Sequence, residues 1–318
     1  MKLFTTILPL ISYLAPIWGC QAKQQPGGVS TVFQLDSTGT WFENFENLAL
    51  RPDGDIIATR MDVPELWLID PITREGRSLV TIPGVTGAIG ITQLTYDTYV
   101  VGAGNVTADP FNFEAGSMQV FLLEFKRGIP TVKLVTALPD AMFINGITPW
   151  SSTEVLVSDT VLGAVYQIDV SRGAITKVLS HEDFAGINGI GVRDGFLYYI
   201  INNSQTFFRV SVNTNFDITG SPEAIFSGLS MDDFSLARDG TAYIAAVGTG
   251  QIIRVDPDGS NVTVAGDVGS MEAIGCTAVR LARSRGFDKI LYATTNGGLG
   301  APVNGTVPEP AKIIAVKL

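Results

Sequence analysis

The sequence predicts an all-β protein, a six-bladed β-propeller whose ring is closed by an N-terminal strand joining the last blade. The first observation is the tetrapeptide Ile-Asn-Gly-Ile, which occurs at residues 144–147 and again, 43 residues later, at 187–190. The second is a recurring turn motif, present as Arg193-Asp-Gly195 and Arg238-Asp-Gly240. The third is the spacing of six repeat starts, near residues 46, 89, 145, 188, 232 and 277. Four-stranded units of about 40–50 residues are typical of a propeller, which limits exposed sheet edges by closing a ring.

Each full repeat contains four short apolar runs separated by turn residues, as four antiparallel strands require. In the first repeat, residues 46–50 and 56–59 flank the turn Pro52-Asp-Gly54, and residues 65–71 and 78–82 follow. The next four repeats have runs at residues 89–94, 99–103, 119–125 and 132–136; 146–149, 154–158, 164–169 and 175–179; 189–192, 196–201, 207–212 and 223–226; and 234–237, 242–246, 251–256 and 262–265.

The sixth repeat has only three apolar runs, at residues 278–282, 289–294 and 312–316. A further run at residues 29–35 precedes the first repeat and has no partner there. We expect this run to be the fourth, outer strand of the last blade, which closes the ring.

The composition favours many short buried strands and argues against a nucleic-acid partner. Of the 318 residues, 46% are apolar, 16% are charged and 34 are Gly, which suits strands joined by tight turns. The formal net charge is −10 and no basic stripe occurs, so binding to nucleic acid is not expected.

Residues 1–22 are expected to be a secretory signal peptide, followed by a single propeller domain over residues 23–318. Lys2 supplies the positive charge, residues 3–18 are apolar, and small residues follow. The alternative is a membrane anchor, but the run is under 18 residues and contains Pro9 and Pro16. We therefore expect a secreted protein with no membrane association after cleavage. Four glycosylation sequons agree with export, at Asn105, Asn202, Asn261 and Asn304.

The chain has two cysteines, Cys20 and Cys276, and no zinc-ligand spacing. If the signal is cleaved before Cys20, the two could form a disulfide that ties the N-terminus to the last repeat. If cleavage falls after Ala22, Cys276 is a lone, buried thiol.

Polar residues at the repeat starts form the first candidate site. The innermost strand of each propeller blade lines the channel, so residues at its start converge on one end of the axis. These residues are Glu46, Asn145, Asn188, and Asp232 or Asp233. Two carboxylates and two amides suit Ca²⁺ or Mg²⁺ better than zinc or copper. The alternative is that these residues only form turns at the strand starts.

The chain resembles the senescence-marker-protein and gluconolactonase family of six-bladed propellers, over nearly all of the sequence after the signal. The resemblance is carried by Glu46-Asn-Leu48, Ile144-Asn-Gly146, Ile187-Asn-Gly189 and Asp232-Asp-Phe234. It implies a divalent cation at the channel mouth, held by Glu46, Asn145, Asn188 and Asp232. In two respects the chain departs from the family. Asp233 stands where the family usually has Gly, and the Arg that binds a polar substrate has no counterpart.

The N-terminal repeat more closely resembles a secreted fungal branch of this superfamily, the hetero-Diels–Alderases of tropolone–sesquiterpenoid biosynthesis. The segments concerned are residues 40–44, 46–54 and 64–71. The resemblance implies an enzyme that joins a tropolone-type quinone methide to an apolar alkene of the humulene type. Such a cycloaddition needs no cofactor. It needs two reactants held together in a site from which water is largely excluded.

Apolar side chains near the repeat starts and in the second-to-third-strand loops fit such a small, apolar or aromatic substrate. The candidate substrate-binding residues are Trp41, Phe42, Met61, Phe111, Phe113, Met142, Phe143, Phe184, Phe234 and Met271. Two of these loops, residues 104–117 and 296–310, are long. Long loops in compact folds are often functional, although tolerated surface insertions are an equal alternative.

His181, the one histidine, precedes the Asn188 strand and could protonate a leaving group or polarise a carbonyl. The alternative is an exposed loop histidine. With His181, Asn145, Asn188 and Asp232 are the candidate catalytic residues. No Gly-x-Ser-x-Gly nucleophile motif occurs, which argues against Ser/His/Asp hydrolysis.

Three functions follow in order of preference. The first is a pericyclase of fungal secondary metabolism that catalyses a hetero-Diels–Alder reaction. The second is a metal-dependent lactonase or esterase, and the third is a non-catalytic propeller that binds an apolar metabolite.

Overall fold

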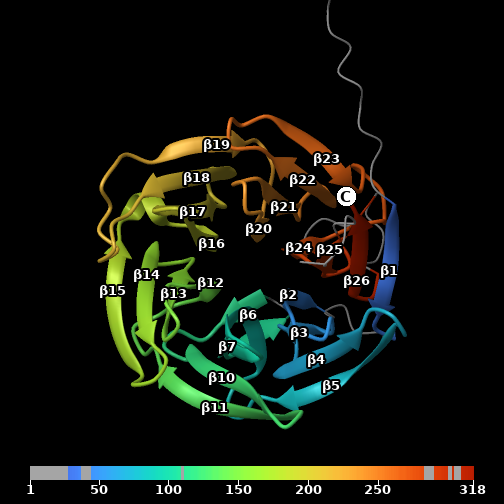
Figure 1. The fold of residues 1–318 in the computed structure, drawn as a ribbon, viewed down its shortest axis with the longest axis horizontal. Coiled ribbons are helices and arrows are strands. Elements are labelled where there is room, and N and C mark those ends of the chain that lie inside the picture. Colours follow the sequence, from blue (N-terminus) through green and yellow to red (C-terminus); the bar gives the residue numbers. More distant parts are fainter. Residues whose placement is uncertain (1–27, 37–43, 109–110, 283–289, 300–302, 304–308) are drawn as a thin grey trace, which may run out of the picture.

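Six four-stranded antiparallel sheets surround a central axis, so the predicted six-bladed propeller is confirmed (Figure 1). The computed structural model describes residues 28–36, 44–108, 111–282, 290–299, 303 and 309–318. Within those ranges, no helix has the length and apolar character needed to cross a bilayer.

The blades follow one another along the chain, each running from the axis outward, and blade 6 is completed by the N-terminal strand. Blade 1 comprises β2 (Phe45–Leu50), β3 (Ile56–Arg60), β4 (Glu65–Asp70) and β5 (Glu75–Thr81). Blade 2 comprises β6 (Gly87–Thr95), β7 (Thr98–Gly104), β10 (Gln119–Lys126) and β11 (Ile129–Ala137). Blade 3 comprises β12 (Ile144–Pro149), β13 (Glu154–Asp159), β14 (Ala164–Asp169) and β15 (Ala174–Ser180).

Blade 4 comprises β16 (Ile187–Arg193), β17 (Phe196–Ile201), β18 (Thr206–Ser211) and β19 (Glu223–Ser227). Blade 5 comprises β20 (Phe234–Leu236), β21 (Ala242–Ala246), β22 (Gln251–Val255) and β23 (Asn261–Ala265). Blade 6 comprises β24 (Cys276–Leu281), β25 (Ile290–Thr295), β26 (Lys312–Lys317) and β1 (Val29–Gln34).

The ring closes as the sequence predicts. Strand β1 pairs antiparallel with β26, from Val29 opposite Val316 to Gln34 opposite Lys312. The first and last strands of the chain therefore share one sheet, which leaves no open blade in the ring.

Outer strands are longer than their apolar runs suggest. Strand β5 begins at Glu75 rather than residue 78, and β11 begins at Ile129 rather than residue 132. Both strands alternate exposed and partly buried side chains, because only one face of an outer strand packs against a neighbour. Polar residues therefore belong to these strands although they interrupt the apolar pattern.

The long blade 2 loop contains a hairpin that the sequence analysis did not predict. It consists of β8 (Val106–Ala108) and β9 (Phe111–Phe113), which pair antiparallel. The helical structure in the described residues is one short 3-10 turn, η1 (Glu182–Phe184). The hairpin leaves blade 2 between its second and third strands, at the end of the ring where the innermost strands begin.

Candidate functional site

The innermost strands of five blades begin with a backbone irregularity at the same end of the ring, which we call the mouth. In blades 1, 2, 3, 4 and 6 the pairing register shifts over the first residues of the strand, as in a β-bulge. The residues at the equivalent position, which we call the mouth residues, are Glu46, Ile89, Asn145, Asn188, Asp232 and Thr277. The predicted repeat starts thus fall on this position in every blade.

Buried hydroxyl groups connect these strand starts from blade to blade. The Thr59 hydroxyl donates to the Ile89 carbonyl of the next blade and accepts from the Asn47 amide at 2.9 Å. Ser158 repeats the arrangement, donating to the Asn188 carbonyl at 2.7 Å and accepting from the Gly146 amide at 2.9 Å. The mouth residues are therefore held in a hydrogen-bonded inner ring.

Glycine follows the mouth residue wherever neighbouring blades approach most closely. A Cβ atom at Gly90 would lie 2.1 Å from the Asn145 carbonyl oxygen, and one at Gly146 would lie 2.6 Å from that of Asn188. No side chain fits at these distances, which explains the Asn-Gly pairs of the repeated motif. Blades 1, 5 and 6 instead carry side chains at this position, Asn47, Asp233 and Ala278.

The structure brings three of the predicted site residues, Glu46, Asn188 and Asp232, into one interacting group. Burial and the nearby Asp233 carboxylate raise the pKa of Glu46 to about 7. Burial, Glu46 and Asp233 raise the pKa of Asp232, while a side-chain hydrogen bond with Asn188 opposes this shift. Asn145, also buried, occupies the equivalent position in the blade beside Asn188. The mouth therefore places two carboxyl groups close together in surroundings that disfavour their negative charges.

One acceptor in this group has no partner. The side-chain oxygen Oδ1 of Asn188 is buried and accepts no hydrogen bond, which is uncommon for a buried polar atom. A hard cation would satisfy this oxygen and reduce the repulsion between Glu46 and Asp232, so the donor set fits Ca²⁺ chemically. The set includes only two free carboxylates. Among the described residues, no group of three or more His, Cys, Asp or Glu side chains is arranged to hold a metal.

The mouth is apolar on its blade 2 side. Ile89 is fully buried and belongs to one hydrophobic cluster with Met61, Val106 and Phe143. Phe143 lies tilted against Phe113, with ring centroids 5.2 Å apart, and Phe111 lies edge-on to Phe143 at 5.8 Å. We call Phe111, Phe113 and Phe143 the aromatic cluster. It extends this buried cluster towards solvent, where Phe111 is 51% exposed.

The hairpin that carries Phe111 and Phe113 has a fixed base. Thr86 exchanges two hydrogen bonds with the backbone of Val106, at 2.7 and 2.8 Å. Asn105 donates to Glu114 Oε2 at 2.7 Å, and its amide donates to the Ser117 hydroxyl at 3.0 Å. These four hydrogen bonds fix the base of the hairpin beside the mouth.

Several predicted site residues lie elsewhere. Phe184 packs against Tyr199 and Phe234 against Phe207, so both rings belong to the core of blades 4 and 5. Met271 is 37% exposed in the loop before blade 6. Met142 is partly buried beside Phe143, and its amide donates to Asp159. Trp41 and Phe42 lie outside the described residues.

The side chain of His181 makes a hydrogen bond within its own loop. Its Nδ1 atom accepts a hydrogen bond from the Asp183 amide at 3.2 Å, capping the η1 turn, and its side chain is 58% exposed. A role for His181 in proton transfer stays a prediction.

Sequence reasoning missed Arg280, which reaches the mouth from blade 6. Its Nη2 atom lies 3.0 Å from Asn47 Oδ1 and 3.1 Å from Asp233 Oδ2. A signal existed in the repeat alignment, because the residue three positions after each mouth residue is small or bears a hydroxyl except in blade 6. The six residues are Ala49, Thr92, Thr148, Gly191, Ser235 and Arg280.

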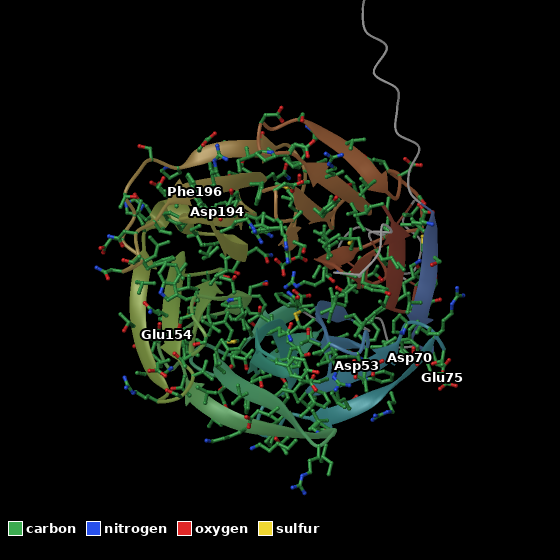
Figure 2. The ribbon with its side chains drawn as sticks, viewed as in Figure 1. Asp53, Asp70, Glu75, Glu154, Asp194 and Phe196 are labelled. Atoms are coloured by element: carbon green, nitrogen blue, oxygen red, sulfur yellow. The ribbon has the colours of Figure 1, made fainter. Side chains whose placement is uncertain are left out.

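Acidic side chains also occur far from the axis. Asp70 and Glu75 lie at the outer edge of blade 1, as Figure 2 shows. The Asp70 carboxylate accepts the amides of Ile72 and Thr73 in a turn. Asp70 therefore stabilises a turn at the outside of the ring.

Two other predictions concern cysteine and glycosylation. Cys276 is a free and fully buried thiol, and Cys20 lies outside the described residues, so a disulfide between them is not shown. Of the sequons, Asn261 is exposed, whereas Asn202 has a buried side-chain oxygen and Asn105 is bonded to Glu114. Asn304 lies outside the described residues. Glycosylation stays a prediction, with Asn261 the most accessible position.

The fold and the mouth define a six-bladed propeller with two neighbouring carboxyl groups at one end. The chain also has a relative in sequence. A protein of Phoma sp described as a "Putative hetero-Diels-Alderase" is 24% identical over 306 residues, covering 81% of this chain and 84% of the relative. The resemblance predicted from the first repeat is thus confirmed in a distant relative. No family model matches the chain.

Solved structures show the same architecture. The calcium-binding protein regucalcin of Agrobacterium tumefaciens has a TM-score of 0.63 at 15% identity, covering 92% of this chain and 94% of that one. A luciferin-regenerating enzyme has a TM-score of 0.66 at 11% identity, with coverages of 91% and 95%. A streptogramin B lyase has a TM-score of 0.56 at 14% identity, with coverages of 86% and 82%. At such identities the likeness shows the fold alone.

Proposed function

We propose that this protein is a pericyclase that catalyses an intermolecular hetero-Diels–Alder cycloaddition in secondary metabolism. The reactants would be a tropolone-type quinone methide and an apolar alkene of the humulene type. The relative from Phoma sp supports the reaction class. The observation that carries the proposal is the aromatic cluster beside the mouth, in which half-exposed Phe111 contacts Phe143, a member of the buried apolar cluster that includes Ile89.

This arrangement suits the two reactants in different ways. The aromatic cluster would hold the alkene, which has no polar group, by burial of apolar surface. The polar mouth residues Asn145, Asn188 and Asp232 would orient the oxygen-bearing diene. A cycloaddition forms both bonds without a nucleophile or an external proton, so the protein acts mainly by holding the reactants in reactive geometry and limiting attack by water. We also propose that the protein is secreted.

The direct test is incubation of purified protein with a quinone-methide precursor and humulene, with the uncatalysed reaction measured in parallel. Faster formation of the adduct with a single stereochemistry supports the proposal. A rate and a stereochemical outcome identical to those of the uncatalysed reaction would exclude it.

A metal-dependent lactonase is the second candidate, favoured by the unpaired Asn188 Oδ1 and the repelling carboxylates Glu46 and Asp232. A Ca²⁺ ion held by Glu46, Asn145, Asn188 and Asp232 would supply a Lewis acid for a lactone carbonyl. The two candidates separate in one experiment with a chelator. Lactone hydrolysis that disappears with the metal supports the second candidate, whereas cycloaddition that survives the chelator supports the first.

A further inference from the structure

A network centred on Arg280 joins three blades at the mouth. The guanidinium group comes from blade 6, and its Nη1 atom donates to the Phe234 carbonyl of blade 5 at 3.1 Å. Its Nη2 atom donates to Asp233 of blade 5 and to Asn47 of blade 1. A planar guanidinium with several fixed donors can make such a set of bonds, which a lysine ammonium cannot reproduce.

The two acceptors are also bonded to one another and to their own backbones. Asn47 Nδ2 donates to Asp233 Oδ2 at 2.8 Å. Asp233 Oδ1 accepts the Phe234 amide at 2.7 Å, and Asn47 Oδ1 accepts the Leu48 amide at 2.9 Å. The Asp233 side chain is only 4% exposed, so its charge depends on Arg280 for compensation.

The network lies directly beside the residues of the candidate site along the chain. Asn47 follows Glu46, and Asp233 follows Asp232, so each mouth carboxylate adjoins a residue whose side chain is fixed by Arg280. In blades 2, 3 and 4 the same position is Gly90, Gly146 or Gly189 and offers no side chain to hold. Only the blades that present a carboxylate at the mouth have this additional support.

We infer that Arg280 is a positioning residue, which fixes the strand starts of blades 1 and 5 and thereby orients the Glu46 and Asp232 carboxylates. The inference depends on the proposed function only in that those carboxylates serve substrate or ion binding. Its structural content, the immobilisation of two strand starts, stands independently. Arg280 acts through Asn47 and Asp233 rather than by contact with substrate.

The test compares Arg280→Met and Arg280→Lys with a matched control, Arg51→Met. Arg51 also bonds a carboxylate of the next blade, Asp97, and is largely buried, but it lies at the end of the ring opposite the mouth. Amide hydrogen exchange is measured at Leu48 and Phe234, together with turnover and KM for the alkene. Lysine keeps the ion pair with Asp233, so it provides a folded variant if the methionine variant is unstable.

Exchange at the Leu48 and Phe234 amides is expected to rise about tenfold or more in Arg280→Met, because the side chains that accept these amides lose their hydrogen bonds from Arg280. In Arg51→Met the exchange at both amides should stay unchanged. Turnover is expected to fall in both Arg280 variants with KM for the alkene unchanged, since the aromatic cluster is intact. Unchanged exchange at both amides, or an equal loss of turnover in Arg51→Met, would overturn the inference. If native protein lacks cycloaddition activity but exchange rises as described, the positioning role stands and the proposed function fails.

Discussion

Phe111 of the β8–β9 hairpin lies edge-on to Phe143 before blade 3, with ring centroids 5.8 Å apart. This contact links an insertion in one blade to the strand start of the next. Because Phe143 also packs in the buried cluster that contains Ile89, the pair connects the apolar core of the mouth to an exposed ring. The first prediction follows from the exposed half of Phe111.

Phe111→Ala is expected to raise KM for the alkene by about tenfold, because an aromatic ring supplies much of the burial available to an apolar ligand. The melting temperature should change little, since the ring is half exposed. The control is Tyr96→Ala, which removes an 81% exposed ring from the β6–β7 turn at the opposite end of the propeller. Equal KM values in the two variants would show that the aromatic cluster does not bind the alkene.

The raised pKa of Glu46 predicts that the stability of the protein depends on pH. The pKa of this carboxyl is raised from 4.5 to about 7 on folding, mainly by burial and then by Asp233. The folded protein therefore holds the proton more tightly than the unfolded chain, and stability falls as pH rises from about 4.5 through about 7. Glu46→Gln should remove this loss and be more stable than the native protein at pH 8 by about 1–3 kcal/mol. Denaturant unfolding with a chelator present, at pH 5 and pH 8, measures the difference.

In that experiment, the native protein and the Gln variant should differ less at pH 5 than at pH 8. A native protein whose stability is the same at both pH values would mean that Glu46 is ionised throughout and compensated by another group.

The unpaired Oδ1 oxygen of Asn188 predicts that this residue contributes to the calcium affinity of the mouth. Asn188→Leu keeps the size of the side chain and removes the oxygen, so calcium affinity measured by calorimetry should fall by roughly tenfold or more if Ca²⁺ binds there. Asn202→Leu is a matched control in the same blade, because its Oδ1 atom is also buried without a partner but is outside the predicted ligand set. Identical calcium affinities in both variants would remove Asn188 from the set.

The inner ring of hydroxyl groups predicts a stability effect. Thr59→Val keeps the shape of a fully buried side chain and leaves the Asn47 amide and the Ile89 carbonyl without that partner. Unfolding free energy should fall by about 1–3 kcal/mol. The control Thr131→Val removes an exposed hydroxyl of the outer strand β11 that donates to the Glu124 carbonyl, and it should change the unfolding free energy by less than about 0.5 kcal/mol.

The repeat starts could be predicted from the sequence because local rules determine them. The Asn-Gly pairs at Asn145 and Asn188 mark positions where a neighbouring backbone leaves no room for a side chain. The same restriction recurs in successive blades, so it appears as a repeat. The strand β1 could be assigned to blade 6 because that blade lacked a fourth apolar run.

Other features depend on contacts between distant segments and could not be predicted in this way. Arg280 meets Asn47 across 233 positions of the sequence, and no periodic pattern encodes that pairing. The contact of Phe111 with Phe143 arises from a hairpin whose short strands have no run long enough to recognise. Phe184 and Phe234 lie at the expected places along the chain, but their rings turn into the core, a choice that depends on the neighbouring strands.

The proposed cycloaddition is tested by the stereochemical composition of the adduct formed from the quinone-methide precursor and humulene. We predict that native protein gives one stereoisomer in large excess, and that Phe111→Ala gives less of that excess while Tyr96→Ala gives the native result. If the adduct has the stereochemical composition of the uncatalysed reaction, and the protein is shown to be folded by its unfolding transition, the proposed hetero-Diels–Alder activity is contradicted.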